Sequence, residues 1–531
     1  MSRLRLVVSS LVTASLLAAC SGAGPTAPVG GIPQGPAGAV HSKPPKFLRL
    51  QRTPPRPPPH RHAVTAAMRA RAKAGGWQEL TNSNAWSNGP ATALLMTDGT
   101  VLVQDYCTSN WYRLTPDSTG SYQNGTWSAV APMPSNYGPL YFASAVLADG
   151  KLIINGGEYN FCTGDETNLG AIYDPTANTW TAVSGPSGWP EIGDAQSVVL
   201  NNGTYMIGNC CTEYQAELDE ATMTWTQVGG ASGGKKDNNS EEGWTLLRNG
   251  QVLTADVLAQ PNSELFNPKT SGWSTAGSVG VNLTQSEEIG PQSMRPDGTV
   301  YVEGANGLSA IYSANGTWTQ GPNLPKVSSQ QLDAADAPTT VLTDGTVLAV
   351  GSPGVYQTPA SFYIFNGKKN LTVASPPDAV NDSSYNIRTL MLPTGQVLED
   401  DGSSDVEIYT GNQKTYPGIA PEITKVSKTL TTGSTYPLSG KRLNGFTQAN
   451  FYGDDDTQAT NYPLVRITNS GSGAVVYART HNHSFMGIGS KKVVSTMFDV
   501  PSTIATGPST LVVVVNGIPS KAVSVNIQSS K

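Results

Sequence analysis

The sequence predicts an all-β chain in which a seven-bladed β-propeller is followed by a smaller C-terminal β-sandwich. Three observations lead to this fold class. Glycine is abundant, with 56 residues, while charged residues make up only 14% of the chain, as is typical of many short strands joined by turns. A hairpin pattern recurs seven times at spacings of 47 to 53 residues. After the last copy the repeat stops, and a different series of strand patterns begins.

Each repeat begins with two short apolar runs joined by a tight turn. The run from Thr97 to Val103, with its Asp-Gly turn, is the first example. Asp-Gly, Asn-Gly or Thr-Gly between two apolar runs is the pattern of a β-hairpin. The turn glycines of the seven repeats are Gly99, Gly150, Gly203, Gly250, Gly298, Gly345 and Gly395.

Each hairpin is followed by an aromatic strand and then, in most repeats, by a strand with a tryptophan. The tryptophans of the first five repeats are Trp127, Trp180, Trp225, Trp273 and Trp318, and Leu371 takes this position in the sixth. Four strands per repeat is the pattern of a kelch-like propeller blade. The seventh repeat lacks this strand. Trp77 lies 50 residues before Trp127, so we expect an N-terminal strand to complete the last blade and close the ring.

The sequence divides into four predicted parts. They are a lipoprotein signal peptide at 1–20, a Pro-rich basic tether at 21–75, the propeller at 76–416 and an immunoglobulin-like (early-set) domain at 417–531. In the last part Val523, Val525 and Ile527 alternate with polar residues, as in a half-buried strand. About seven short strands in such a segment favour an immunoglobulin-like sandwich.

The N-terminus has the pattern of an export signal. Its apolar run, residues 6–17, is shorter than the ~20 residues that a transmembrane helix needs. Residues 17–20, Leu-Ala-Ala-Cys, resemble the bacterial lipobox, in which the cysteine is acylated. We expect a lipid anchor at Cys20 and a location in the bacterial cell envelope, at the outer membrane or in the periplasm. The alternative is a plain secretory signal in which Cys20 has no role.

Charge is distributed unevenly along the chain. Residues 1–75 contain 11 Lys or Arg and no acidic residue, which leaves 22 basic and 39 acidic residues for the body. A basic, extended tether suits an anionic membrane surface, although basic residues can also simply keep a linker soluble. The acidic body argues against nucleic acid as a partner. We expect a monomer that contacts the membrane through its lipid anchor.

Four cysteines remain in the body when Cys20 is set aside. An even number in an exported protein favours disulfides, because the compartment is oxidising. Spacing does not determine the pairing. The first expectation is Cys107 with Cys162 and Cys210 with its neighbour Cys211.

The repeat register also predicts a site. Nine or ten residues before each turn glycine lies the start of the innermost strand, and these starts converge at one mouth of the central channel. The residues there are Pro90, Tyr141, Asp194, Glu241, Glu288, Asp336 and the pair Tyr385-Asn386. Converging carboxylates repel one another unless they are solvated, partly protonated or bound to a cation. The register therefore predicts a site for a glycan or other small polar ligand, or for a cation such as calcium. A solvated acidic rim without any ligand is the alternative.

Two histidines occur in the body, His481 and His483. Residues two apart on an extended strand share a face, so both imidazoles could meet one metal ion. Two ligands are too few for a zinc site. A surface His-x-His without metal is the alternative.

Several of these segments resemble the galactose oxidase and glyoxal oxidase family of copper radical oxidases. Tyr141 opens a segment similar to the one with the family's cross-linked tyrosine, and Tyr385-Asn386 is similar to its Tyr-His segment. His481 lies in a segment similar to the C-terminal loop that supplies a further copper ligand. The resemblance implies a kelch propeller, an immunoglobulin-like domain and a copper site at the axial mouth, with Tyr141, Tyr385, His481 and His483 as metal candidates.

Two departures from the family pattern concern the copper site. Asn386 replaces a copper-ligating histidine, and Pro90 stands where a cysteine would couple to Tyr141. The segment 453–466 resembles bacterial kelch-repeat lipoproteins. We therefore expect a surface-anchored propeller that binds a glycan or polyol at the acidic mouth. The alternatives are a degenerate copper radical oxidase, a hydrolase with paired carboxylates, and a protein–protein scaffold of the cell envelope.

Overall fold

The computed structural model describes residues 65–164, 166–449 and 460–530. The predicted signal peptide, Cys20 and most of the predicted tether lie outside these residues. The described chain is nearly all-β, as predicted, and its helix α1 (Ala66–Ala74) is accompanied by three short 3₁₀ turns, η1 (Ala231–Gly233), η2 (Ala379–Asn381) and η3 (Ser384–Asn386). Among the described residues, none forms a helix with the length and apolar character needed to cross a bilayer.

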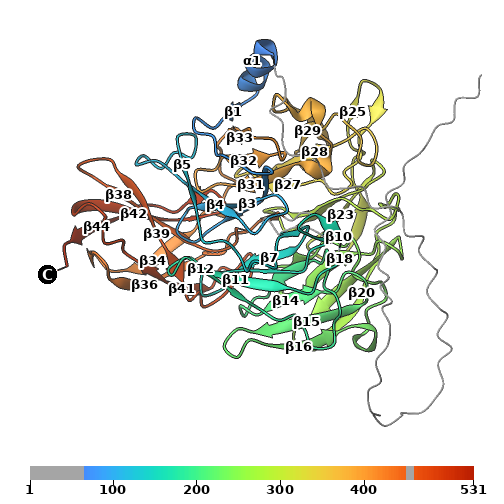
Figure 1. Cartoon of the computed structure of the whole chain (residues 1–531), viewed down its shortest axis with the longest axis horizontal. Coiled ribbons are helices and arrows are strands. Elements are labelled where there is room, and N and C mark those ends of the chain that lie inside the picture. The colour runs from blue at the N-terminus through green and yellow to red at the C-terminus, as the bar shows by residue number, and fades with distance from the viewer. Residues whose placement is uncertain (1–64, 165, 450–459, 531) are drawn as a thin grey trace, which may run out of the picture. The chain divides into compact units, whose positions relative to one another are not determined.

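Between Trp77 and Tyr409 the described chain forms seven sheets of antiparallel strands, each with four strands in one order (Figure 1). The first three sheets are β2 (Pro90–Leu95), β3 (Val101–Asp105), β4 (Trp111–Thr115) and β5 (Thr126–Ala129); β7 (Ala143–Val146), β8 (Leu152–Asn155), β11 (Gly170–Asp174) and β12 (Thr179–Ala182); and β13 (Ser197–Val199), β14 (Tyr205–Gly208), β15 (Tyr214–Asp219) and β16 (Thr224–Gly229). The next three are β17 (Thr245–Leu246), β18 (Val252–Ala255), β19 (Asn262–Asn267) and β20 (Gly272–Ser278); β21 (Gln292–Met294), β22 (Val300–Glu303), β23 (Ser309–Tyr312) and β24 (Trp318–Gln320); and β27 (Thr339–Val341), β28 (Val347–Gly351), β29 (Ser361–Phe365) and β30 (Asn370–Thr372). The last sheet joins β31 (Arg388–Met391), β32 (Val397–Asp400) and β33 (Val406–Tyr409) to β1 (Trp77–Glu79). Short pairings outside these sheets involve β6 (Pro139–Leu140), β9 (Tyr159–Asn160), β10 (Thr163–Gly164), β25 (Lys326–Val327) and β26 (Gln330–Gln331).

The hairpin turns and the tryptophan strands lie where the repeat pattern placed them. Gly99 joins β2 to β3 with a φ of 76°, and a Cβ there would approach the Tyr477 ring to 2.4 Å. The turn therefore requires glycine both for its conformation and for its close contact. The tryptophans of the first five repeats lie in the last strand of their sheets.

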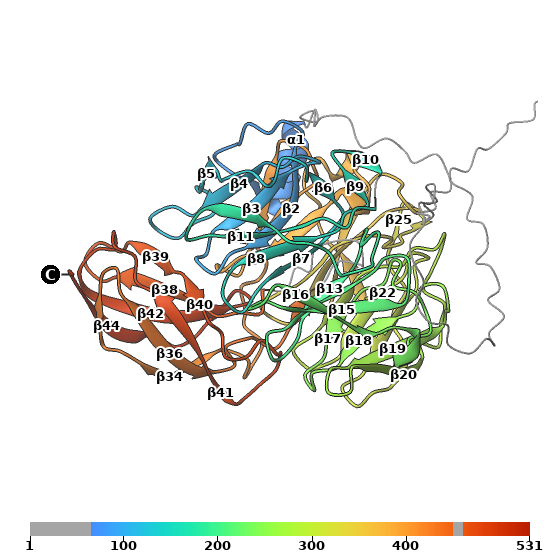
Figure 2. The ribbon, with the colours of Figure 1, turned by 60° about the horizontal axis from the view of Figure 1, so that its bottom comes forward.

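First strands of neighbouring sheets contact one another in the pairs β7–β13, β17–β21, β21–β27 and β27–β31, and the views in Figures 1 and 2 agree with this arrangement. The Ser293 and Thr339 hydroxyls of β21 and β27 lie 2.6 Å apart, and the Thr340 hydroxyl of β27 donates to that of Thr389 in β31 at 2.9 Å. β31 in turn contacts β2. The starts of the first strands are thereby brought together, and this is the arrangement of a propeller-like fold.

The chain after the seventh sheet forms two further sheets that enclose an apolar core including Leu438, Phe498 and Val513. One sheet contains β34 (Glu422–Val426), β36 (Thr435–Lys441), β41 (Val493–Asp499) and β40 (Thr480–His481). The other contains β35 (Thr429–Thr431), β44 (Val523–Gln528), β42 (Gly507–Val515), β38 (Leu464–Asn469) and β39 (Val475–Ala478), with β43 (Ile518–Pro519) paired to β42.

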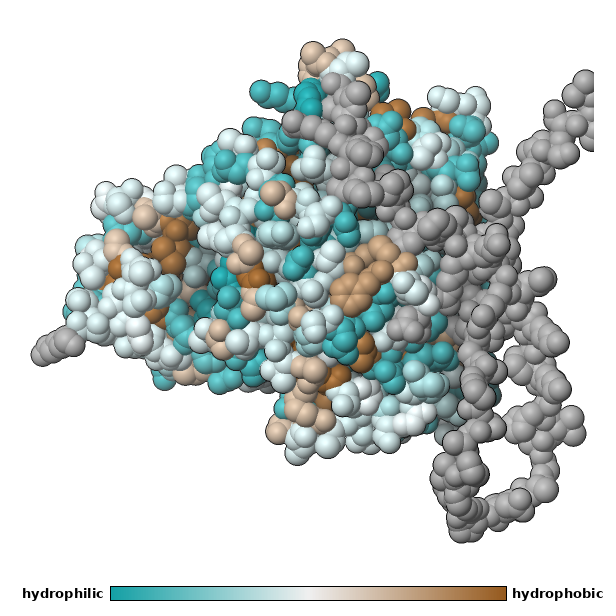
Figure 3. Space-filling model, viewed as in Figure 1, coloured by the Kyte–Doolittle hydropathy of each residue, from teal (hydrophilic) through white to brown (hydrophobic). Residues whose placement is uncertain are grey.

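This C-terminal sandwich contacts the hairpin turns of the repeat region. The His483 main-chain N–H donates to the Ala148 carbonyl at 2.9 Å, and that of Met486 donates to the Asn201 carbonyl at 3.0 Å. One further strand, β37 (Gln448–Ala449), pairs with β21, the first strand of its sheet. The sandwich therefore contacts the first strands near their hairpin turns, at the ends that are remote from the predicted mouth. On the face drawn in Figure 3, hydrophobic residues form small separate patches.

The end of the predicted tether is ordered, which differs from the extended segment expected there. Its Ala-rich sequence favours a helix, and the Thr65 hydroxyl accepts from the Met68 N–H to cap α1. Arg69 forms an ion pair with Glu79 of β1. The helix therefore leads directly into the first strand.

Candidate functional site

Pro90 opens β2, and the other predicted mouth residues lie two to four residues before the first strands of their sheets. Tyr141 precedes β7, Asp194 precedes β13, Glu241 precedes β17, Glu288 precedes β21, Asp336 precedes β27, and Tyr385 and Asn386 precede β31. Each therefore lies at the end of its first strand that is remote from the hairpin turn. The contacts below show which of them come together.

Tyr356 links two of the predicted carboxylates. It lies in the loop after β28, and its hydroxyl is 2.6 Å from Glu288 Oε1 and 2.9 Å from Asp336 Oδ2. The neighbouring Asp336 carboxyl group lowers the pKa of Glu288 and so partly opposes the effect of burial. A hydroxyl has one proton to donate, so this contact set needs a proton on one of the two carboxyl groups. Protons are shared here as in other close carboxyl pairs.

Burial raises the pKa values of the central carboxyl groups. The pKa of Glu288 rises from 4.5 to about 7, mainly because the group is desolvated. Desolvation also raises the pKa of Asp194 well above 3.8, and the charges of Glu166 and Glu158 add to this effect. The charge of Glu288 also raises the pKa of Asp194, and the charge of Glu241 raises the pKa of Tyr356. Four carboxylates from four neighbouring sheets therefore form one electrostatic cluster.

The two predicted tyrosines line a pocket beside this cluster. Tyr141, Tyr385 and Asn386 share the pocket with Pro90, Tyr106, Arg388 and Asp401, among others. The Tyr356 and Tyr385 rings lie 4.8 Å apart, which connects the pocket to the carboxyl pair. The free volume is about 20 Å³, enough for one water-sized group.

Several residues of this site have a left-handed backbone conformation. The φ angles are 54° for Tyr141, 60° for Glu241, 49° for Asp336 and 59° for Tyr356. Such values are uncommon for residues other than glycine and cost about 1–3 kcal/mol each. Strained residues of this kind gather at functional sites, because surrounding structure holds side chains in a required orientation.

Both disulfides form as the sequence led us to expect, Cys107 with Cys162 and Cys210 with Cys211. The first packs in one small apolar cluster with Leu140 and Tyr141. The second lies beside Glu166, with Cys210 Sγ at 3.9 Å from its Oε2. The two disulfides therefore fix loops that border the mouth.

His481 and His483 have their side-chain contacts in the sandwich and not with Tyr141 or Tyr385. The His481 imidazole lies 3.1 Å from Asp499 Oδ1, and His483 Nδ1 lies 2.9 Å from the Thr496 hydroxyl, all within the sandwich. Burial lowers the pKa of His483 to about 3, so its ring is neutral. The main chain of His483 contacts Ala148, which lies beyond the far end of β7 and seven residues after Tyr141. At the rise of an extended strand, seven residues separate Ala148 from Tyr141 by about 20 Å.

The donor atoms around the pocket do not fit copper. Copper sites in proteins favour imidazole or sulfur ligands, and both histidines of the described residues lie in the sandwich. The pocket instead offers phenols, an amide and a carboxylate, and the Arg388 guanidinium lies 5.8 Å from the centre of the Tyr141 ring.

Sequence reasoning missed three residues of the site. Tyr356, Glu166 and Arg388 each contact or act on predicted residues. Tyr356 could have been found, because loops after the second strand of a hairpin open at the same end as the start of the first strand. Arg388 opens β31, and its position two residues after Asn386 gave no comparable signal.

Comparisons with known proteins agree with the predicted fold. The kelch-like protein terF of Aspergillus terreus is 26% identical over 230 residues, which are 41% of this chain and 47% of terF. The chain thus matches less than half the length of this relative. A fungal alcohol oxidase of the AA5 family, solved in complex with copper, superposes with a TM-score of 0.50 at 14% identity and covers 85% of this chain and 98% of the oxidase.

The fold is a kelch-like, galactose oxidase-like β-propeller. This confirms the predicted propeller likeness, and identity at this level supports the fold alone. Virginiamycin B lyase from Staphylococcus aureus matches with a TM-score of 0.44 and 10% identity over 63% of this chain and 99% of the lyase. No protein-family model matches the sequence.

Proposed function

We propose that this chain is a lipid-anchored propeller of the bacterial cell envelope that binds a glycan or polyol at its axial mouth. In this proposal the seven sheets are the blades of one closed ring, and the C-terminal sandwich is an immunoglobulin-like domain. The kelch-like fold is compatible with ligand binding, protein binding or an oxidase-like role, so the choice depends on the site.

The observation that carries the proposal is the convergence of strained polar residues at the mouth. Tyr141, Glu241 and Asp336 come from separate sheets, and each has a left-handed backbone conformation. The carboxyl groups of Asp194 and Glu288 are buried beside them, with raised pKa values. A merely solvated rim would need neither the burial nor the strain.

The pocket suits a single hydroxyl or amino group. Its volume of about 20 Å³ excludes a whole sugar ring, so the rest of a ligand would lie outside against the half-buried tyrosines. Aromatic faces with a few fixed polar groups are typical of small-molecule sites. The phenols of Tyr141 and Tyr385 and the Asn386 amide can donate and accept hydrogen bonds, as a polyhydroxylated ligand requires.

The carboxyl geometry favours binding over glycoside hydrolysis. Retaining glycosidases hold their two carboxyl groups about 5 Å apart, and inverting enzymes hold them farther apart. The Tyr356 hydroxyl contacts both Glu288 and Asp336, at 2.6 and 2.9 Å, and so occupies the position that a glycosidic bond or a water would need.

A glycan array followed by calorimetry with the best ligand tests the proposal. Tyr385→Phe removes a hydroxyl group at the mouth and Asp194→Asn replaces an ionisable carboxyl group with an amide, and we expect at least tenfold weaker binding in each. Glu422→Gln is the matched control, because Glu422 is an exposed carboxylate of the sandwich. Failure of the wild-type protein to bind any glycan or polyol, or equal affinity in all variants, would refute the proposal.

Anchoring is tested separately. Cys20→Ser removes the proposed lipid attachment, and fractionation should move the protein from the membrane to the soluble exported fraction. Retention of the variant in the membrane would contradict a lipid anchor at Cys20.

A further inference from the structure

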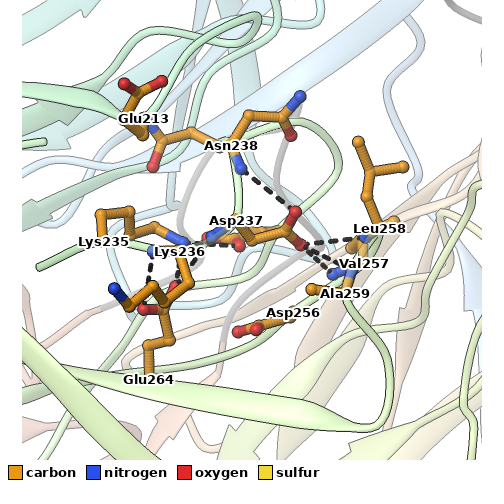
Figure 4. Close-up of polar contacts among 12 residues, drawn as sticks. Glu213, Lys235, Lys236, Asp237, Asn238, Asp256, Val257, Leu258, Ala259 and Glu264 are labelled. Atoms are coloured by element: carbon orange, nitrogen blue, oxygen red, sulfur yellow. Dashed lines mark hydrogen bonds and ion pairs between the residues drawn. The ribbon is translucent and has the colours of Figure 1, made fainter. Parts of the chain in front are cut away.

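A second group of acidic side chains lies in the fourth sheet region, and none of its members lines the tyrosine pocket. Figure 4 shows Asp237, Asp256 and Glu264 of this group. Asp237 belongs to the loop after β16, Glu242 precedes β17, Asp256 follows β18, and Glu264 lies in β19. All four are buried, as is Lys235, which lies among them. We call these five residues the buried acidic cluster.

Three of these residues have partners within the protein. Lys235 Nζ lies 2.8 Å from Glu242 Oε1 and 2.8 Å from Glu264 Oε2. Asp237 Oδ2 accepts from the main-chain N–H groups of Val257 and Leu258 at 2.8 and 2.9 Å. These contacts account for the positive charge of Lys235 and for much of the charge on Asp237 and Glu264.

Other oxygen atoms in the cluster have no hydrogen-bond partner. Both carboxylate oxygens of Asp256 and Oε2 of Glu242 are buried and unpaired. In Figure 4 no dashed line reaches the Asp256 carboxylate. Asp256 and Glu242 are each 0% exposed, so bulk water does not replace the missing donors. A buried carboxylate without a partner is strongly destabilising.

Thr254 provides an independent observation. Its hydroxyl is also fully buried without a partner. Thr254 lies opposite Glu264 in the β18–β19 pairing, and side chains two apart along a strand share a face. Thr254, Asp256 and Glu264 therefore lie on one side of the sheet, where the hydroxyl adds an unused neutral oxygen to the unpaired carboxylates.

We propose that the buried acidic cluster binds one calcium ion through Asp237, Glu242 and Asp256. One oxygen from each of these residues lies within 4.8 Å of the others, which is compatible with the 2.3–2.6 Å Ca–O distances of protein sites. The three groups supply oxygen ligands only, as a hard cation prefers. The ion would give the Asp256 carboxylate and Glu242 Oε2 the partner that the described residues do not supply.

Charge balance supports a divalent cation. Four carboxylates and one ammonium give a net charge of −3 when all are ionised, and one divalent ion reduces this to −1. Lys235 alone neutralises one carboxylate.

The proposed ion would also order one side of the mouth. Glu242 directly follows Glu241, which lies at the mouth with a φ of 60°. A cation bound by Glu242 would hold this segment against the loop after β18. This inference concerns a separate site and does not depend on glycan binding.

The direct test is metal binding by the whole exported chain after removal of metal with a chelator. Native mass spectrometry with added calcium should show one tightly bound ion, and calcium should raise the Tm. Terbium should bind in its place and luminesce on tryptophan excitation, because the Trp273 ring lies 4.9 Å from Lys235 Nζ inside the cluster. A protein that binds neither ion overturns the proposal.

Asp256→Asn provides the matched variant. It keeps the shape of the side chain and breaks no hydrogen bond of the Asp256 carboxylate, so the protein should still fold, as circular dichroism can verify. We expect at least tenfold weaker calcium binding and loss of the terbium signal. Glu303→Gln is the control, since Glu303 is an equally buried carboxylate in the next sheet, and it should bind calcium like the wild type. Equal affinity in Asp256→Asn would overturn the proposed ligand set.

Discussion

The Tyr356 hydroxyl lies 2.6 Å from Glu288 Oε1, across two neighbouring sheets of the propeller. The same hydroxyl also reaches Asp336. Because burial raises the pKa of Glu288 to about 7, the carboxyl group in this contact changes its protonation near neutral pH. The mouth is therefore a hydrogen-bonded network, and its stability and its binding should respond together to changes in its members.

Tyr356→Phe should weaken this network without opening a large cavity. It removes the hydroxyl shared by Glu288 and Asp336, and loss of a buried hydrogen-bond partner costs about 1–3 kcal/mol. We expect a lower urea midpoint and at least tenfold weaker ligand binding. Tyr112→Phe, in the outer part of the first sheet, is the control and should leave binding unchanged. Unaltered stability and binding in Tyr356→Phe would show that the network is not needed.

Stability should fall as the pH rises from about 5 to about 8. Burial raises the pKa of Glu288 and of Asp333 to about 7 and that of Glu303 to about 8. In this range the folded state holds protons that the unfolded chain has released, so the free energy of unfolding decreases with pH. Each unit of raised pKa is worth about 1.4 kcal/mol at most.

Urea unfolding at several pH values checks this dependence. Glu303→Gln, which stays neutral at every pH, should flatten the profile most clearly between pH 7 and 8. A wild-type stability that increases over this interval would contradict the raised pKa values.

The Cys107–Cys162 disulfide should stabilise the fold far more than its vicinal counterpart. It joins residues 55 apart, and closing such a loop in the unfolded chain is worth about 4 kcal/mol in the chain-entropy model. The Cys107→Ser, Cys162→Ser double variant should therefore unfold at a clearly lower urea concentration. The Cys210→Ser, Cys211→Ser variant closes no long loop and should lose much less. Equal losses would contradict this account.

Trp77 should be the most important side chain of the N-terminal strand. It is 1% exposed, its indole N–H donates to the Ala374 carbonyl at 2.7 Å, and its ring lies 4.9 Å from that of its strand partner Tyr409. Trp77→Ala should cost about 3–5 kcal/mol, as for other buried tryptophans. Trp127→Ala, at the half-buried outer strand of the first repeat, should cost less. Denaturant unfolding of both variants makes the comparison, and similar costs would argue against ring closure by β1.

The repeat pattern predicted much of the fold because turns and strand alternation are local signals. Gly99 marks the first hairpin turn of a sheet and Trp127 marks its last strand, and sequence spacing alone identified both. The placement of Glu288 and Asp336 before their first strands followed from the same spacing. Helix α1 was missed because its apolar pattern is weak, and capping by Thr65 and the ion pair of Arg69 with Glu79 help to fix it.

The interactions within the site could not be predicted, because they join residues far apart in the sequence. No local signal pairs Tyr356 with Glu288 or brings Asp256 to Glu242. His481 shows the opposite case. Its sequence context resembles a copper ligand of a known family, whereas its imidazole pairs with Asp499 inside the sandwich. Orientation within a domain decides the role of such a residue, and sequence spacing does not determine orientation.

The most direct test of the central claim is a crystal structure of the protein with the tightest ligand from the glycan screen. We predict that one hydroxyl or amino group of the ligand lies between Tyr141, Tyr385 and Asn386, with the remaining rings against the neighbouring tyrosines. A ligand bound on the sandwich or on the outer strands, with this pocket unchanged, would contradict the account.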